Sequence, residues 1–144
     1  MLVSQILKTK PDTAVVTVKP GMLISDAAKM LSEKRIGTLI ISKDGKKPDG
    51  ILSERDIVRE LGRQGGACLN HTVEDLMTTK LVTCGADERA DAILQKMTDG
   101  RFRHMPVLED GSLIGLISLG DVVKARLMEL SMEKDALEGM IMGH

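Results

Sequence analysis

The stretch Gly115-Leu116-Ile117-Ser118-Leu119-Gly120-Asp121-Val122-Val123 combines a short apolar strand with the beginning of a helix. Leu116 and Ile117 favour a strand, and Ser118 is a good N-cap residue. Asp121 follows at the third helical position, where a carboxylate can accept free backbone N–H groups and is favoured by the helix dipole. The stretch therefore predicts a strand that ends at a helix N-terminus, a place where α/β proteins hold anionic ligands.

A second copy of this pattern occurs earlier in the chain, as Gly50-Ile51-Leu52-Ser53-Glu54-Arg55-Asp56-Ile57-Val58. The two copies share a Gly, an apolar pair, a Ser, two variable positions, an Asp and a second apolar pair, at an offset of 115 − 50 = 65 residues. Either copy alone could be a helix cap and nothing more. Two copies in register indicate an internal repeat.

The repeat extends over most of the chain. At an offset of 66 residues, Ile24, Ala27, Ala28 and Leu31 match Ala90, Ile93, Leu94 and Met97, and spacings of three and four predict an amphipathic helix in each copy. Each unit is then predicted to run strand, helix, strand, turn, strand, helix, with strands at 14–18, 38–42 and 50–52, and at 81–84, 105–108 and 113–117. The predicted helices cover 24–34, 56–61 and 89–97, and a last one begins at 121. We expect an α/β protein (α+β by some schemes) with units at 1–66 and 67–144, a linker at 63–67 and one pseudo-twofold body.

The composition excludes several classes of function. The chain has 144 residues, a net charge of −1 and one aromatic residue, Phe102, so it lacks the basic surface and stacking rings of nucleic-acid-binding proteins. Cys68 and Cys84 have no metal-binding spacing, and we expect no metal site. No apolar run is long enough to span a membrane, and we expect a cytoplasmic protein with reduced thiols.

With its two Gly-apolar-apolar-Ser-x-x-Asp motifs and matched Thr17 and Thr83, the chain resembles a tandem pair of cystathionine-β-synthase-type (CBS) domains from Val3 to about Arg126. The resemblance implies two units of βαββα type with clefts between them that bind an adenosine-containing ligand. In such a cleft an apolar slot takes adenine, an Asp accepts the ribose hydroxyls, and Ser or Thr with basic groups meets phosphate.

The resemblance also implies which residues form each cleft, because each cleft takes its Ser and Asp from one unit and its Thr from the other. We expect the cleft at Asp121 to be the principal site, since Arg103 and His104 offer cationic donors for phosphate there. This site would comprise Thr17, Met22, Ile36, Gly37, Arg103, His104, Met105, Pro106, Ser118 and Asp121. The second site would comprise Thr83, Phe102, Arg103, Thr38, Ile40, Ser53, Arg55 and Asp56.

Three classes of function stay open at this point. The first is a regulatory, non-catalytic module that binds AMP, ADP, ATP or NAD(H), with a separate protein as its regulated partner. An enzyme is disfavoured, because the sequence offers no nucleophile–base pair, phosphate-binding loop or metal cluster. The third is a structural dimerisation module with empty clefts. We also expect a homodimer, because the helices of the second unit and the residues Ile24, Ala27, Ala28 and Leu31 supply apolar surface that the thin sheets cannot cover.

Overall fold

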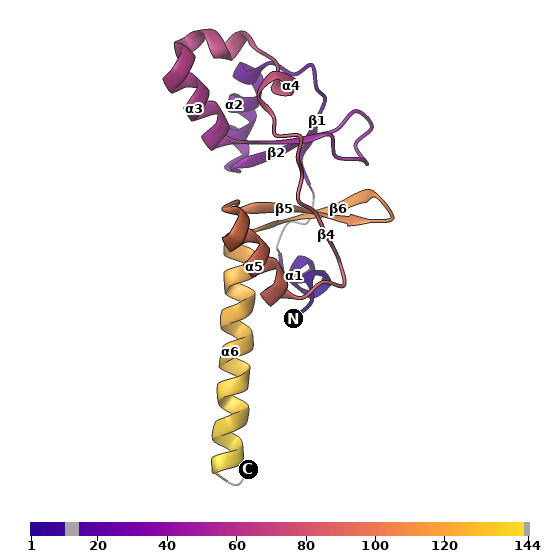
Figure 1. The fold of residues 1–144 in the computed structure, drawn as a ribbon, viewed down its shortest axis with the longest axis vertical. Helices are drawn as coiled ribbons and strands as arrows, with labels where there is room; N and C mark the ends of the chain where they lie inside the picture. The colour runs from indigo at the N-terminus through magenta and orange to yellow at the C-terminus, as the bar shows by residue number, and fades with distance from the viewer. Residues whose placement is uncertain (11–14, 143–144) are drawn as a thin grey trace.

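The structure is a computed structural model that describes residues 1–10 and 15–142. Helices and strands alternate along both halves of the chain (Figure 1). In the first half they are α1 (Val3–Thr9), β1 (Thr17–Val18), α2 (Ile24–Lys34), β2 (Thr38–Ile41), β3 (Gly50–Ser53) and α3 (Glu54–Gln64). A 3₁₀ helix (Gly65–Asn70) leads to α4 (Val73–Leu76), β4 (Cys84–Gly85), α5 (Ala90–Gly100), β5 (His104–Glu109), β6 (Ser112–Ser118) and α6 (Leu119–Ile141).

The strands form two sheets with the same topology. β1 pairs parallel with β2, which pairs antiparallel with β3, and β4, β5 and β6 repeat this arrangement. The matched registers, with Thr38 opposite Ser53 and His104 opposite Ser118, confirm the predicted α/β repeat. The two sheets approach each other in the middle of the molecule, and the helices lie on the outer sides (Figure 1).

Each unit has its own hydrophobic core, but the short helices α1 and α4 are exchanged between the units. Val3 and Ile6 of α1, which are 0% and 2% exposed, pack into the core of the second sheet with α5 and α6. Val73 of α4 packs into the core of the first sheet with α2 and α3. The spatial units are therefore offset from the repeats of the sequence, and chain crossings tie the two cores together.

This exchange explains the glycine that opens each repeated motif. A Cβ atom at Gly115 would lie 2.7 Å from Cδ2 of Leu7, a partly buried residue of α1. At Gly50 the added Cβ would meet Sδ of Met77, directly after α4. Leu7 and Met77 occupy matching positions of the repeat, so the two glycines allow close packing where each exchanged segment crosses the last strand of a sheet.

Most predicted element boundaries agree with the structure, and the helix predicted at 24–34 is confirmed as α2. The strand predicted at 81–84 is wrong except at Cys84, because pairing with β5 begins only where Cys84 lies opposite Val107. The predicted linker 63–67 is also wrong, since these residues form the end of α3 and the start of the 3₁₀ helix. Of the first predicted strand, Thr17–Val18 is β1, whereas Ala14 lies outside the described residues.

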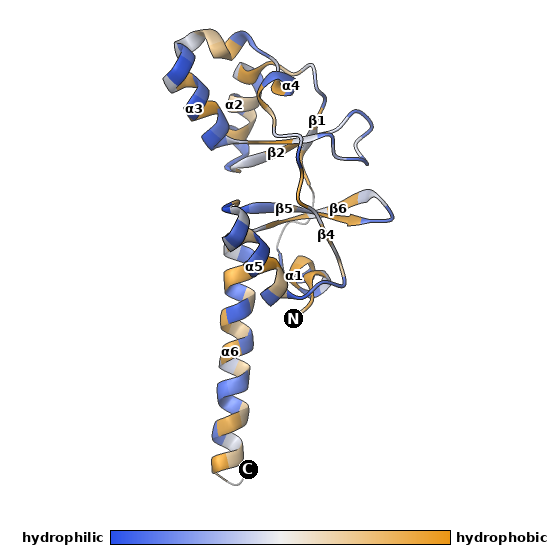
Figure 2. Cartoon of the chain, viewed as in Figure 1, coloured by the Kyte–Doolittle hydropathy of each residue, from blue (hydrophilic) through white to orange (hydrophobic). Residues whose placement is uncertain are grey.

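The burial of α2 does not support the part of the dimer argument that rests on this helix. Ile24, Ala27 and Leu31 are at most 5% exposed in the first core, and Ala28 packs against that core. Exposed large apolar side chains gather instead on α6, which projects away from the body (Figure 2). Among residues 1–10 and 15–142, no helix has the combination of length and apolar character that crossing a membrane requires.

Candidate functional site

Two cavities lie between the units. Cleft 1 has a volume of about 620 Å³ and opens beside the start of α3, whereas cleft 2, of about 460 Å³, opens beside Ser118 at the start of α6. Both volumes are in the range of small-molecule sites. Gly37, Thr38 and His104 line both clefts, which therefore share a wall.

Cleft 1 combines an apolar wall with an excess of cationic side chains. The apolar side chains come from both units and are Ile51, Leu81, Val82, Phe102 and Pro106. The ionic ones are the cations Arg55, Arg59, Lys80, Arg101 and Arg103 and the anions Glu54 and Asp56. Five cations against two anions make this cleft suitable for an anionic ligand.

The Asp56 carboxylate is positioned by the N-terminus of α3. Its Oδ2 accepts the Ser53 backbone N–H at 2.8 Å and the Ser53 hydroxyl at 3.0 Å, while the Asp56 N–H donates to Ser53 Oγ. Its Oδ1 accepts from Arg59 Nη2 at 2.9 Å, and the Arg59 side chain is 58% exposed. The repeated motif is therefore a capping box that also fixes a carboxylate at the edge of cleft 1.

Asp121 makes the same cap at α6 but has a different cationic partner. Its Oδ2 accepts the Ser118 N–H and pairs with Lys10 Nζ, both at 2.9 Å. Lys10 Nζ also donates to the Leu116 carbonyl at 2.8 Å. Burial alone would raise the pKa of Asp121, but the Ser118 N–H and Lys10 outweigh burial and hold this pKa below its usual value. Asp121 is thus an ionised carboxylate that Lys10 already neutralises.

The wall shared by the clefts contains a hydrogen bond between the units. Thr38 Oγ1 lies 3.0 Å from His104 Nδ1, and these two residues occupy matching positions of the repeat. Burial, and then the nearby Lys10 ammonium, lower the pKa of His104 below its ordinary value of 6.5. His104 is therefore a mainly neutral group near pH 7, so its expected role as a cationic phosphate donor is corrected.

This histidine predicts a loss of stability in mild acid. Because the pKa of His104 is lower in the folded protein than in the unfolded chain, the unfolded chain binds more protons below about pH 6.5. The free energy of unfolding should therefore decrease as the pH falls through this region. Denaturant titrations at several pH values should give a shallower decrease for His104→Gln. An equally steep decrease in the variant would show that other groups cause it.

The structure brings only part of each predicted site together. Of the residues predicted for the second site, Thr38, Ser53, Arg55, Asp56, Phe102 and Arg103 line cleft 1. Of those predicted for the principal site, Ile36, Gly37, His104 and Ser118 line cleft 2, whereas Arg103 does not. Pro106 lines cleft 1 instead of cleft 2, and Asp121 lines a small neighbouring cavity of about 90 Å³ together with Lys10. Besides Asp121, five predicted residues line neither cleft: Thr17, Met22, Ile40, Thr83 and Met105. Met105 and Ile40 are fully buried, because their side chains point into the protein from central strands.

Several residues of the clefts were missed by reasoning from the sequence. Arg59 could have been found, because it stands three residues after Asp56 on the same helix and can reach back to it. Lys10 and the segment Lys80, Leu81 and Val82 carry no local signal. The segment reaches cleft 1 because Thr78 pairs with Ile51 at the edge of the first sheet, through two backbone hydrogen bonds of 2.9 and 3.0 Å.

Comparison with protein families finds two matches to the same model. Residues 3–63 and 73–128 each match the model described as "CBS domain". These ranges coincide with the two copies of the repeat and together cover more than half of the chain.

Individual relatives agree with this match. A mitochondrial CBS domain-containing protein of Arabidopsis thaliana, CBSX3, is 36% identical over 124 residues, which are 83% of this chain and 60% of that protein. This chain therefore spans less than two thirds of that relative's length. Since the relative is named as mitochondrial, the expected cytoplasmic location of this chain stays a prediction.

Solved structures have the same fold. The CBS-domain containing protein ATU1752 from Agrobacterium tumefaciens has a TM-score of 0.82 and 42% identity, covering 88% of this chain and 99% of its own. The CBS domain pair of protein MJ0100, solved in complex with 5′-methylthioadenosine and S-adenosyl-L-methionine, has a TM-score of 0.77 and 26% identity over 90% of this chain and 98% of its own.

Proposed function

Because the chain belongs to the CBS domain family, we propose that it is a non-catalytic regulatory module that binds a phosphorylated adenosine ligand in cleft 1. The observation that carries this proposal is the composition of cleft 1, where a helix-capped carboxylate, an apolar wall and five cations face one cavity. The family matches indicate no catalytic domain. A separate regulated protein belongs to the same proposal.

The apolar wall of cleft 1 suits an adenine ring. Leu81 and Val82 approach from the segment after α4, and Phe102 and Pro106 approach from the second unit. Val82 is 44% exposed, so this wall offers apolar surface that a flat base can cover. An adenine base inserted between the two units would contact both of them, which gives the ligand a way to affect their relative positions.

The Asp56 carboxylate suits the two hydroxyl groups of a ribose. An ionised carboxylate only accepts hydrogen bonds and has about four lone-pair sites, of which the cap and Arg59 use three. The Arg59 ion pair is largely exposed, and such pairs contribute little to stability, about 0–1 kcal/mol. A ribose can therefore replace Arg59 at small cost, and the released guanidinium becomes available to a phosphate.

The charge of cleft 1 selects among adenosine-containing ligands. The MJ0100 pair was solved with 5′-methylthioadenosine and S-adenosyl-L-methionine, which contain adenosine without a phosphate. Here Arg55, Arg101 and Arg103 add positive charge that disfavours a sulfonium cation and favours a phosphate. AMP, ADP or ATP fits this pattern, and NAD(H) stays a prediction without support from the relatives described above.

We propose cleft 1 as the principal site, in place of the cleft expected at Asp121. Arg103 lines cleft 1 and supplies one of the two cations on which the earlier expectation rested. Lys10, whose side chain is 25% exposed, is held between Asp121 and the Leu116 carbonyl, so a ribose at Asp121 would have to break two short contacts. Cleft 2 then serves as a weaker site, whose cations Lys10 and Lys34 suit a small anion or a second nucleotide.

Adenine nucleotide is expected to raise the melting temperature. At a ligand concentration of about 100 times the dissociation constant, one site adds roughly 2.7 kcal/mol to the free energy of unfolding, a shift on the order of several degrees. In thermal-shift measurements, AMP should raise the melting temperature more than 5′-methylthioadenosine, which lacks the phosphate. AMP should also raise it more than GMP, which has a different base.

The same measurement tests the alternatives. Equal shifts with AMP, GMP and inorganic phosphate would indicate an anion effect without adenine recognition. If no nucleotide shifts the melting temperature, the clefts are empty and the chain is the structural dimerisation module considered above. Mass spectrometry of ligand that copurifies with the protein would identify the nucleotide directly.

A further inference from the structure

The imidazole of His104 lies between the two clefts and lines both of them. Among the described residues that line cleft 1 and cleft 2, it is the single histidine. Histidine is the side chain whose ordinary charge change falls between about pH 5 and 8. Of these lining residues, His104 is therefore the one whose charge a bound anion can change near neutral pH.

The hydrogen bond between His104 and Thr38 does not fix the charge of the imidazole. Nδ1 of His104 lies 3.0 Å from Oγ1 of Thr38, which is a buried residue. A hydroxyl group both donates and accepts, so it can donate to Nδ1 of a neutral ring or accept from the Nδ1–H of a protonated one. The contact therefore survives protonation, and the surroundings of the ring decide its charge.

Burial and four charged groups act on the imidazole. Burial has the largest effect and lowers the pKa of His104 below 6.5. Lys10 and Arg103 lower this pKa further. Asp121 and Glu54 raise it. The other charged side chains that line the clefts are Arg55, Asp56, Arg59, Lys80 and Arg101 in cleft 1 and Lys34 in cleft 2. Two cations and two anions thus oppose each other at His104, and burial favours the neutral ring.

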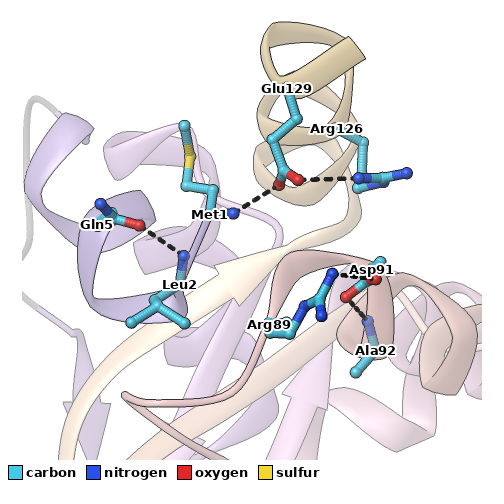
Figure 3. A network of polar contacts seen from close by, with 8 residues as sticks. All are labelled: Met1, Leu2, Gln5, Arg89, Asp91, Ala92, Arg126 and Glu129. Atoms are coloured by element: carbon cyan, nitrogen blue, oxygen red, sulfur yellow. Dashed lines mark hydrogen bonds and ion pairs between the residues drawn. The ribbon is translucent and has the colours of Figure 1, made fainter. Parts of the chain in front are cut away.

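Lys10 and Asp121 form a fixed ion pair, because helix α1 is attached to α6 on both sides. Before α1, the Met1 nitrogen lies 3.0 Å from Oε1 of Glu129 (Figure 3). After α1, Lys10 Nζ lies 2.9 Å from Oδ2 of Asp121. The effects of two paired opposite charges largely cancel at a distance, whereas those of a single charge do not. An additional anion in a cleft therefore changes the potential at His104 more than this pair does.

We propose that His104 takes up a proton when a nucleotide binds in cleft 1, so that the affinity for the nucleotide increases as the pH falls through neutrality. The proposal rests on the proposed function, because the phosphate of the ligand supplies the negative charge. A negative charge near a partly buried imidazole favours its protonated form. One N–H bond forms at the ring, and the buffer supplies the proton. Because linkage is reciprocal, the proton favours the nucleotide as much as the nucleotide favours the proton.

Calorimetric titration of AMP into the full chain at about pH 7 measures this proton. Titrations at one pH in Pipes and in Bis-Tris, two buffers with different ionisation enthalpies, give the number of protons taken up per AMP. The parent should take up a measurable fraction of one proton. AMP itself contributes little and with the opposite sign, because its phosphate has a pKa of about 6 and is already mostly a dianion.

Two histidine variants and a ligand without phosphate are the controls. His104→Gln should lose the proton uptake, and His71→Gln should retain it, because His71 lines neither cleft. From about pH 8 to 6.5, the dissociation constant for AMP should fall by at most about tenfold per pH unit in the parent and in His71→Gln, and much less in His104→Gln. Adenosine should bind without proton uptake, because it carries no negative charge.

The results that contradict the proposal differ from those that contradict the proposed function. If AMP binds without proton uptake, or with equal uptake in the parent and in His104→Gln, the proposal is overturned and the nucleotide site remains. Equal uptake with adenosine would overturn it as well. If AMP does not bind at all, the proposed function is wrong, and this proposal is wrong with it.

Proton NMR tests the same proposal without replacing His104. The chain has three histidines, His71, His104 and His144. The variants His71→Gln and His144→Gln identify the ring signals of the other two, which leaves the third signal for His104. A pH titration of this signal should give a pKa below 6.5 without ligand and a higher pKa with AMP. An unchanged pKa at saturating AMP would overturn the proposal.

Discussion

Replacing Asp56 by Ala is expected to weaken AMP binding roughly tenfold to hundredfold. The change removes the carboxylate that we assign to the ribose hydroxyls of cleft 1. Leaving such polar groups unpaired costs about 1–3 kcal/mol. Calorimetric titration of AMP into the parent and the variant measures this loss as a change in the dissociation constant of the tighter binding event.

Asp121→Ala is the matched control for this experiment. Both aspartates stand at the third position of a helix whose N-cap is a serine, and both accept the N–H of that serine. Each variant therefore loses the carboxylate of a capping box, at a cost on the order of 0.3–1 kcal/mol in stability, together with one ion pair, to Arg59 or to Lys10. A difference between the two variants in affinity then reports on the ligand. Melting temperatures recorded for both variants verify that the fold survives.

The control also separates the two assignments of the principal site. If Asp121→Ala abolishes the tight event and Asp56→Ala leaves it unchanged, the principal site is the one expected from the sequence, and Lys10 must move when ligand binds. If neither substitution changes the affinity, the ribose role of both aspartates is wrong. If Lys10 competes with the ribose for Asp121, Lys10→Met should strengthen AMP binding at Asp121.

Ile6→Ala is expected to lower the free energy of unfolding by about 2–5 kcal/mol, which lowers the melting temperature on the order of ten degrees. Ile6 is 2% exposed in the core of the second unit, although it lies in the first sequence repeat. The substitution leaves a cavity between α1 and the second sheet. Lys8→Ala, at an exposed position of the same helix, should change stability little.

Hydrogen exchange shows which unit loses stability in the Ile6→Ala variant. Because α1 packs against α5 and α6, amide protection should fall first in α5, β5 and β6. Protection in α2, β2 and β3 should be closer to that of the parent. A loss that begins in the first sheet would show that α1 belongs energetically to the unit in which its sequence lies.

Much of the fold could be predicted because its signals are local. The amphipathic spacing from Ile24 to Leu31 predicted α2, and the Ser-x-x-Asp motif predicted both capping boxes, since their hydrogen bonds join residues three apart. The repeat then added what one copy could not supply, namely that the same unit is formed twice. The motif included Gly50 and Gly115, but the sequence did not indicate the exchanged segments that pack against these two glycines.

The arrangement of the clefts depends on contacts between residues far apart in the chain. Lys10 reaches Asp121 across 111 positions, and Thr38 reaches His104 across 66. No local pattern indicates such pairs, because they form only when α1 and α4 exchange units and the two sheets meet. The sequence by itself therefore determined the repeated unit, its capped helices and the aspartates at their starts. Only the tertiary structure decided which aspartate faces an open, cationic cleft, because that depends on which distant cation each carboxylate meets.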